Sequence, residues 1–447
     1  MTTIQFPEAF KWGAATASYQ VEGAAAEDGR SASIWDVFAH TPGNVKNGET
    51  GDEACDSYHL YEEDVALLDE LDVDLYRFSI SWSRVLPDGT GELNPAGVAY
   101  YRNLIQALLD RGIEPMITLY HWDLPQVLQE DGGWENRKTA EAFQYYAEAM
   151  YKEFGGQVKK WLTINEPWCA SFLSNYLGVH APGKKDLQVA VDVAHHLLVA
   201  HGLAVQSFRK LVPDGEIGYA PNVTWTEPFS DRKEDVEACR TSLMWHKEWF
   251  MDPVFIGTYP DRLVQLFEKH NAVLHATEED MKIIAQPIDF MGINYYTGGL
   301  GRYSEGNWLF DLEEIPLDER RTDIGWPIYA DGFYKILRSI TETYGEVPIY
   351  ITENGACYNH EVENGEVHDK ERIDYLKQHL TALKRAMDSG VPIRGYLVWS
   401  LLDNFEWAEG YDKRFGIVHV NFDTFERTKK DSYLWYQEVV KAKAFEV

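Results

Sequence analysis

A short apolar run, rich in residues that favour β-strands, recurs along the chain and is followed each time by polar loop residues and a helical stretch. Eight such runs are present, at residues 11–20, 75–82, 114–122, 160–168, 216–225, 289–297, 347–355 and 393–404. Amphipathic segments with helical spacing lie between them, at residues 58–71, 100–111, 139–154, 192–211 and 372–389. Strands that alternate with helices indicate a parallel sheet. Eight such units close naturally into a (β/α)₈ barrel.

An open, doubly wound sheet is the main alternative. It predicts a glycine-rich phosphate-binding loop after the first strand, but the first run ends in Tyr19-Gln20-Val21-Glu22. No Ser/Gly tract or charge block divides the 447 residues, and single barrels reach over about 400 residues with insertions. The sequence therefore predicts one domain over residues 1–447, a single (β/α)₈ TIM barrel with its active site at the C-terminal ends of the strands.

Polar and aromatic residues close all eight runs. They are Ser18-Tyr19-Gln20, Ser81-Trp82, Tyr120-His121-Trp122, Asn165-Glu166, Asn222, Asn294-Tyr295-Tyr296, Glu353-Asn354 and Asp403-Asn404. In a (β/α)₈ barrel the C-terminal strand ends meet at one mouth, where the chemistry is assembled. A structural polar cap explains one or two such ends but not eight, so we expect a functional site at this mouth.

Glu166 and Glu353 each close an apolar strand, where burying a carboxylate is costly unless it is paired or used. A structural glutamate with an arginine partner explains either one alone, but two on the fourth and seventh strands face each other across the mouth. Glycoside hydrolysis requires such a pair: one carboxyl group protonates the leaving oxygen and the other attacks the anomeric carbon. Arg77 and the Tyr296 hydroxyl are expected to keep Glu353 ionised, and its charge is expected to keep Glu166 protonated.

At these residues the sequence resembles glycoside hydrolase family 1, the β-glucosidase family. The resemblance covers nearly the whole chain. Its most specific motifs are Thr163-Ile-Asn-Glu-Pro167, Ile351-Thr-Glu-Asn-Gly355, Tyr120-His-Trp122 and Trp399-Ser-Leu-Leu-Asp-Asn-Phe-Glu-Trp407. It implies a (β/α)₈ barrel, retention of the anomeric configuration and no cofactor. It also implies that Glu166 is the acid/base and Glu353 the nucleophile.

The resemblance further implies roles for the residues around the two glutamates. Contacts to the hydroxyls of the non-reducing sugar are expected from Gln20, His121, Asn165, Glu406 and Trp407, with Asn165 at the 2-hydroxyl. Aromatic rings around this sugar are expected at Trp122, Trp399 and Phe415, with Trp399 as the platform beneath it. Support beside the nucleophile is expected from Asn294 and Tyr296, and contacts to the leaving group from Asn222 and Trp326.

The expected function is therefore a retaining, exo-acting β-glucosidase. It would hydrolyse terminal non-reducing β-D-glucosyl residues from cellobiose, short oligosaccharides and aryl or alkyl β-glucosides through a covalent glycosyl-enzyme. Action on β-galactosides or β-fucosides stays open, because the hydroxyl-reading residues admit several epimers.

Single residues argue against related activities. Family members that cleave thioglucosides carry Gln where this chain has Glu166, and those that cleave 6-phosphoglycosides replace the pair kept here as Glu406-Trp407. The same pair, placed at the far end of a terminal sugar, argues against an endo-acting glycanase on this barrel. A non-catalytic carbohydrate-binding protein would be expected to lack one of the two carboxylates.

Charge and cysteine usage limit the partners and the location. The chain has 41 basic and 72 acidic residues, a net charge of −31, so repulsion from nucleic acid and anionic lipid is expected. The cysteines at 55, 169, 239 and 357 form no CxxC pair, which is typical of reduced thiols. The histidines at 195, 196 and 201 lack a carboxylate partner in a metal-binding motif, so packing or surface roles are expected.

Neither a signal peptide nor a run of roughly 20 apolar residues, the length of a membrane helix, is expected. These features predict a cytoplasmic protein without metal or cofactor, and they leave a homo-oligomer open.

Overall fold

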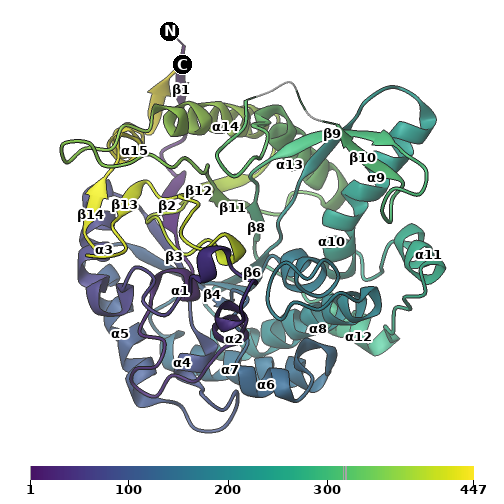
Figure 1. The fold of residues 1–447 in the computed structure, drawn as a ribbon, viewed down its shortest axis with the longest axis horizontal. Coiled ribbons are helices and arrows are strands. Elements are labelled where there is room, and N and C mark those ends of the chain that lie inside the picture. The colour runs from purple at the N-terminus through teal and green to yellow at the C-terminus, as the bar shows by residue number, and fades with distance from the viewer. Residues whose placement is uncertain (1, 316, 318–319) are drawn as a thin grey trace.

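Eight parallel strands form the central sheet of the protein, in the hydrogen-bonded order β6-β5-β4-β3-β2-β12-β11-β8. The computed structural model describes residues 2–315, 317 and 320–447. The strands are β2 (Lys11–Ala15), β3 (Leu75–Ser79), β4 (Glu114–Tyr120), β5 (Lys160–Asn165), β6 (Glu216–Ala220), β8 (Met291–Asn294), β11 (Ile349–Asn354) and β12 (Ile393–Trp399). Because all neighbouring strands run parallel, their carboxyl ends lie at the same end of the sheet (Figure 1).

The two edge strands, β6 and β8, close the sheet into a barrel. The Asp289 amide donates to the Ile217 carbonyl at 2.9 Å, and the Val223 amide donates to the Asn294 carbonyl at 3.0 Å. Asn222 and Asn294 also form a parallel bridge. The predicted (β/α)₈ barrel is thus confirmed, and the open sheet is excluded.

The strands are shorter than the predicted runs, because the runs continue beyond the sheet into loops or short helices. Strand β2 ends at Ala15, and the rest of its run enters the short helix α1 (Ser18–Val21). Of the run at 289–297, the segment Met291–Asn294 is strand. The polar residues of the barrel mouth lie at the strand ends, as Asn294 and Glu353 do, and in the segments that follow, as Glu166 does.

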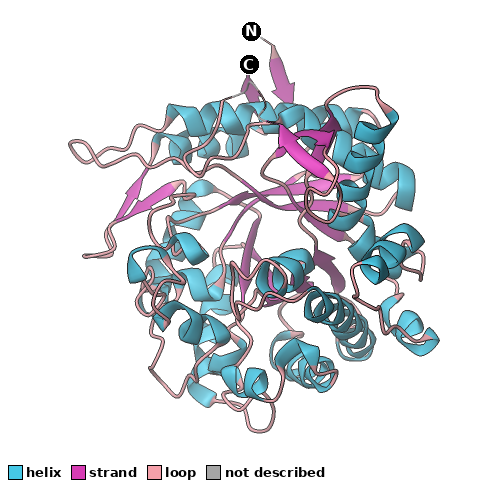
Figure 2. Ribbon diagram, turned by 45° about the vertical axis from the view of Figure 1, so that its right-hand side comes forward, coloured by secondary structure: helices cyan, strands magenta, loops and turns pink. Residues whose placement is uncertain are grey.

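Helices cover the outside of the barrel (Figure 2). The predicted helical segments correspond to α3 (Ser57–Leu71), α5 (Pro95–Leu109), α7 (Lys138–Phe154), α8 (Leu187–Leu211) and α14 (Lys370–Asp388). Helix α5 begins before its predicted segment because Pro95 occupies the first turn, where a missing N–H breaks no helical bond.

Other helices were not predicted. Those in the long connection after β6 are α9 (Lys233–His246), α10 (Glu248–Phe255), α11 (Asp261–Lys269) and α12 (Glu278–Ile284). Helices α13 (Ala330–Tyr344) and α15 (Asp431–Ala442) follow β8 and β12. Short helices α2 (Ile34–His40), α4 (Trp82–Val85) and α6 (Gln126–Glu130) lie in the loops after β2, β3 and β4.

Small sheets extend the barrel. Strands β7 (Trp225–Pro228), β9 (Gly298–Tyr303) and β10 (Leu312–Ile315) form one sheet, which joins the loop after β6 to the loop after β8. Strand β1 (Thr3–Gln5) pairs with β15 (Ala444–Glu446), so the two termini lie side by side (Figure 1). Strand β13 (Val418–Val420) pairs with β14 (Arg427–Lys429) beyond β12.

Helix α8 is long and apolar enough, by length and composition alone, to cross a membrane. The expectation that no segment reaches this length was therefore wrong. However, 72% of the most apolar window of this helix is buried inside the protein. Helix α8 is thus apolar because it packs between the barrel and other helices.

A substitution tests the seam at which the barrel closes. A Cβ atom on Gly218 of β6 would lie 2.2 Å from the Phe290 carbonyl oxygen, next to β8. Because this oxygen belongs to the backbone, we expect Gly218→Ala to lower the free energy of unfolding by about 3 kcal/mol in denaturant titrations. The control is Gly156→Ala, since no described heavy atom lies within 4 Å of its Cβ position. Equal stability of the two variants would contradict this account of the seam.

Candidate active site

The carboxyl ends of the strands surround a cavity of about 690 Å³. Glu166, directly after β5, and Glu353, near the end of β11, both line it. Their exposed fractions are only 5% and 3%. A cavity of this size is typical of a small-molecule site, so one ligand meets both carboxyl groups.

Local irregularity of the backbone directs the two glutamates. The register of β11 shifts against both neighbouring strands, and that of β5 shifts against β6. Glu353 thereby lies opposite Asn294 on β8. Glu166 adopts a left-handed backbone conformation, with φ of 47°, and its amide donates to the Ala220 carbonyl at 2.7 Å. Such irregularities re-aim side chains next to active sites, and here they aim both carboxyl groups into the cavity.

Glu353 receives a hydrogen bond on each carboxylate oxygen. Arg77 Nη1 donates to Oε1 at 2.7 Å, and the Tyr296 hydroxyl donates to Oε2 at 2.5 Å. Burial raises the pKa of Glu353, while the charge of Arg77 and the hydrogen bond from Tyr296 oppose this rise. Arg77 thus supplies the counter-charge that an ionised Glu353 needs.

Glu166 has different surroundings. Asn294 Nδ2 donates to Glu166 Oε1 at 2.8 Å. Burial and the negative charge of Glu353 raise the pKa of Glu166 to about 8, although Asn294, the Cys169 thiol and Arg77 act in the opposite direction. At neutral pH Glu166 therefore holds a proton. A carboxyl group with a raised pKa and a carboxyl group paired with Arg77 thus face the same cavity.

Arg77 also orients His121, through the side chain of Asn165. Arg77 Nη2 and Asn294 Nδ2 both donate to Asn165 Oδ1, at 2.7 and 3.0 Å. The Asn165 amide nitrogen therefore donates to His121 Nε2, at 3.0 Å. Burial and the charge of Arg77 lower the pKa of His121 well below its usual value, so the ring is neutral and its proton is on Nδ1. His121 thus offers an N–H donor at the cavity.

Several buried polar atoms around the cavity lack a hydrogen-bond partner among the described residues. They are Gln20 Oε1, His121 Nδ1, Asn222 Oδ1 and Glu406 Oε2. Gln20 is fixed from the other end, because its Nε2 donates to Asn404 Oδ1 and to the Phe405 carbonyl, both at 3.0 Å. Buried polar atoms are normally hydrogen-bonded. A ligand with several hydroxyl groups, which both donate and accept, satisfies this mixed set.

Aromatic rings form much of the cavity wall. The His121 ring stacks on Trp399 with centroids 5.8 Å apart, and the rings of Trp122 and Trp407 lie 4.7 Å apart. The rings of Trp326 and Phe415, which also line the cavity, have centroids 5.9 Å apart. Flat apolar faces beside polar atoms suit the two kinds of surface that a sugar ring presents.

The structure gathers the predicted site residues at this cavity. Those that line it are His121, Trp122, Glu166, Asn222, Asn294, Tyr296, Trp326, Glu353, Trp399, Glu406, Trp407 and Phe415. Arg77 and Asn165 contact lining residues from behind, and Gln20 is bonded to the loop that carries Glu406.

Contrary to the expectation for all eight ends, the ends Ser18-Tyr19-Gln20, Ser81-Trp82 and Asp403-Asn404 do not line the cavity, and neither does Asn354 beside Glu353. Asn354 Nδ2 donates to the Tyr295 carbonyl at 2.7 Å. Asp403 accepts hydrogen bonds from Lys430 and Arg414 at 2.7 and 2.9 Å. These polar residues hold the loops around the barrel end in place.

Sequence reasoning missed other residues that line the cavity, among them Trp168, Cys169, His180 and His246. Trp168 and Cys169 follow Glu166 closely, and this proximity is a signal that could have found them. His180 lies in a loop and His246 at the end of α9, where no pattern in the sequence indicates the site.

The histidines of α8 have packing roles. His195 Nδ1 lies 2.9 Å from the Tyr259 hydroxyl, and His201 Nδ1 lies 2.7 Å from the Thr163 hydroxyl. Within the described part of the chain, no three His, Cys, Asp or Glu side chains are grouped so that they could hold a metal ion.

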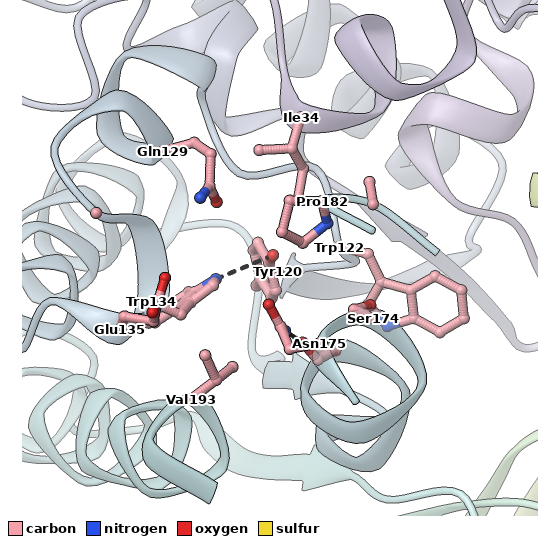
Figure 3. Close-up of a pocket in the computed structure, with 13 residues that line it drawn as sticks. Ile34, Tyr120, Trp122, Gln129, Trp134, Glu135, Ser174, Asn175, Pro182 and Val193 are labelled. Carbon is pink, nitrogen blue, oxygen red and sulfur yellow. Dashed lines mark hydrogen bonds between the residues drawn. The ribbon is translucent and has the colours of Figure 1, made fainter. Parts of the chain in front are cut away.

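A second, much smaller cavity of about 10 Å³ is bordered by Trp122 (Figure 3). Across it, Trp134 Nε1 donates to the Tyr120 hydroxyl at 3.0 Å. This volume is about what one water molecule needs. The small cavity is therefore too small for a sugar, whereas the cavity at the barrel mouth, which holds both glutamates, has room for one.

Comparison with known proteins agrees with this geometry. The model of Glycosyl hydrolase family 1 matches residues 2–445. The chain belongs to this family. The family 1 chain is 49% identical to β-glucosidase A of Acetivibrio thermocellus, over 100% of both sequences. It is 47% identical to a 1,4-β-D-glucan glucohydrolase of Thermotoga neapolitana, over 98% of each.

A solved structure shows the same fold. The family 1 glycoside hydrolase of Thermotoga maritima, complexed with a cyclophellitol analogue transition state mimic, matches with a TM-score of 0.97. It is 46% identical, and the match covers 100% of both chains. The barrel of this family 1 hydrolase and its relative therefore agree over their full length.

The coupling between the two glutamates of this family 1 hydrolase can be measured directly. Glu353→Gln removes the negative charge that helps to raise the pKa of Glu166, so this pKa should fall below about 8. Titration of ¹³C-labelled glutamate side chains by NMR measures the change. Glu148→Gln, on the surface helix α7, is the control and should leave Glu166 unaffected. A Glu166 pKa that stays the same in Glu353→Gln would refute the coupling.

Proposed function

We propose that this protein is a retaining, exo-acting β-glucosidase that hydrolyses cellobiose, short β-linked oligosaccharides and aryl or alkyl β-glucosides. One observation carries the proposal: Glu166, whose pKa is raised to about 8, and Glu353, paired with Arg77, face the same cavity. The names of the two relatives, a β-glucosidase and a glucan glucohydrolase, support glucosides over β-galactosides or β-fucosides.

In the first step, a Glu353 oxygen attacks the anomeric carbon while Glu166 donates its proton to the glycosidic oxygen. The bond between that oxygen and the anomeric carbon breaks, the leaving group departs as an alcohol, and an ester links Glu353 to the sugar. Arg77 and Tyr296 keep Glu353 ionised before the attack, and Asn294 holds Glu166 in place through its 2.8 Å hydrogen bond.

In the second step, the ester has no negative charge, so one cause of the raised pKa of Glu166 disappears. Glu166, now ionised, accepts a proton from a water molecule that attacks the anomeric carbon. The ester bond breaks and Glu353 leaves as a carboxylate. Two inversions at one carbon give net retention, so the released sugar has the β configuration.

The unpartnered polar atoms support the proposed sugar-binding roles. Gln20 Oε1, His121 Nδ1–H and Glu406 Oε2 contact the hydroxyls of the terminal sugar. In this proposal Trp399 is the platform beneath the sugar ring, Trp407 contacts a sugar hydroxyl, and Asn165 contacts the 2-hydroxyl. Asn222 and Trp326 contact the leaving group.

The charge of the cavity favours an unphosphorylated sugar. Its wall includes Glu166, Glu353, Glu314, Glu406 and Glu409, whereas Arg321 is the one lysine or arginine among the described residues that line it. A 6-phosphate would meet acidic groups without a cluster of cations to bind it. This composition argues against a phospho-β-glucosidase.

Several other expectations stay predictions. They are the single domain over residues 1–447, the cytoplasmic location and the activity without a cofactor. The match over residues 2–445 supports the first. The cysteines, all free and buried, support a reducing compartment. The oligomeric state stays open.

Replacing the proposed nucleophile tests the mechanism. Glu353→Ala should lower the turnover of an aryl β-glucoside by several orders of magnitude, because the covalent step is lost. Azide should restore part of the activity by attacking the anomeric carbon from the vacated side, so the product should be the α-glucosyl azide, identified by NMR. Glu148→Ala, remote from the cavity, is the control and should keep full activity. A β-configured azide product would refute the role given to Glu353.

The exo action is tested with two substrates. If Glu406 and Trp407 close the far end of the sugar site, the enzyme should release glucose from cellobiose and leave the viscosity of a soluble β-glucan nearly unchanged. Glucose release and viscosity are measured in parallel at equal enzyme concentration. Rapid loss of viscosity would instead favour an endo-acting glycanase.

A further inference from the structure

We propose that the hydroxyl of Thr352 positions the Asn294 amide and thereby maintains the hydrogen bond that Asn294 donates to Glu166. The inference rests on the proposed role of Glu166 as acid/base. Thr352 is fully buried in β11, directly before Glu353. Its Oγ1 donates to Asn294 Oδ1 at 2.6 Å. Thr352 is a positioning residue, because it touches Glu166 only through Asn294.

The orientation of the Asn294 amide decides whether an N–H donor or a carbonyl oxygen faces Glu166. In the observed orientation, Nδ2 donates to Glu166 Oε1 at 2.8 Å and to Asn165 Oδ1 at 3.0 Å. A half-turn of the amide would point its oxygen at both of these oxygens. Asn165 cannot adapt by turning, because its Oδ1 also accepts from Arg77 at 2.7 Å. The productive orientation is therefore the one in which Asn294 Oδ1 faces Thr352.

Without the Thr352 hydroxyl, Asn294 Oδ1 would lose its donor inside a closed site. A buried acceptor without a partner is costly, so the amide would shift or turn toward another donor. Either movement weakens the bond to Glu166. The Thr352 hydroxyl thus acts on Glu166 through the Asn294 side chain.

The neighbouring strand leaves room for this hydroxyl. A Cβ atom on Gly292 of β8 would lie 2.8 Å from both Oγ1 and Cγ2 of Thr352. Glycine at this position therefore opens the space that the threonine side chain fills. Thr352 also lies where the register between β11 and β8 shifts, between the pairs that Ile351 and Glu353 make. This shift brings Thr352 and Asn294 together.

The bond from Asn294 favours the ionised form of Glu166. The titratable groups that face Glu166 from the other elements are Glu353 on β11, Arg77 on β3, Cys169 after β5, Tyr296 after β8 and Glu406 after β12. A substitution at Thr352 removes none of these groups. Asn294 also lowers the pKa of Glu353 through a hydrogen bond, so a change in the titration of Glu166 reports the position of Asn294, and the titration of Glu353 is followed in the same experiment.

The test separates the hydroxyl from the size of the side chain. Thr352→Ser and wild type have the hydroxyl, whereas Thr352→Val and Thr352→Ala lack it. Threonine and valine have similar volumes, and so do serine and alanine. If valine prevents folding, serine and alanine still form a pair that differs by the hydroxyl alone.

The measurement is the pH dependence of kcat/KM for phenyl β-glucoside, whose poor leaving group needs the proton of Glu166. The quantity compared is the pH at which the alkaline limb of this profile falls. Wild type and Thr352→Ser should share this limb, and Thr352→Val and Thr352→Ala should shift it upward by about half to one pH unit. With 2,4-dinitrophenyl β-glucoside, whose leaving group needs little protonation, the first step should be nearly equal in all four proteins.

The inference would be overturned if the pH of the alkaline limb grouped by side-chain volume, with Thr352→Val like wild type and Thr352→Ala like Thr352→Ser. Four identical limbs would also overturn it. If wild type cleaves no β-glucoside, the proposed function fails instead. NMR titration of Glu166 in the same four proteins then decides the positioning role independently, with the same grouping by hydroxyl expected.

Discussion

The buried guanidinium of Arg77 is the group on which the site depends. A charge with no exposed surface needs partners on all sides, and Arg77 finds them on three other strands. It donates to Glu353 Oε1 and the Thr352 carbonyl on β11, to Asn165 Oδ1 on β5 and to Thr118 Oγ1 on β4. One cation from β3 therefore connects four strands at the barrel mouth. The N–H groups of Arg77 fix the orientation of the side chains that accept hydrogen bonds from them.

This arrangement explains how two identical side chains acquire opposite roles. Both glutamates are buried, so burial alone raises both pKa values. What separates them is that Arg77 donates to Glu353, while Glu166 is bonded to the neutral amide of Asn294 and feels the charge of Glu353. Enzymes keep one carboxyl group protonated and another ionised at the same pH by giving them environments that separate their pKa values.

The sequence indicated the strands, the barrel mouth and the catalytic pair, because apolar runs that end in polar residues carry this information locally. The helices α9 to α12 and the sheet of β7, β9 and β10 follow no regular alternation, so the order of elements could not predict them. His180 and His246 reach the cavity through long connections. The role of Thr352 depends on a register shift, which no pattern of residue types reveals. Helix α8 was predicted over residues 192–211, but its full length and its apolar character were not, because it is buried on most sides.

Left-handed backbone conformations at the site have a consequence for stability. Glu166, Trp122 and Trp407 have φ values of 47°, 80° and 53°, and such non-glycine residues cost on the order of 1 kcal/mol each. Glycine would relieve this strain but would remove the carboxyl group or the indole ring. Evolution toward greater heat resistance must therefore spare these three positions, and improve the outer helices or the seam between β6 and β8 instead.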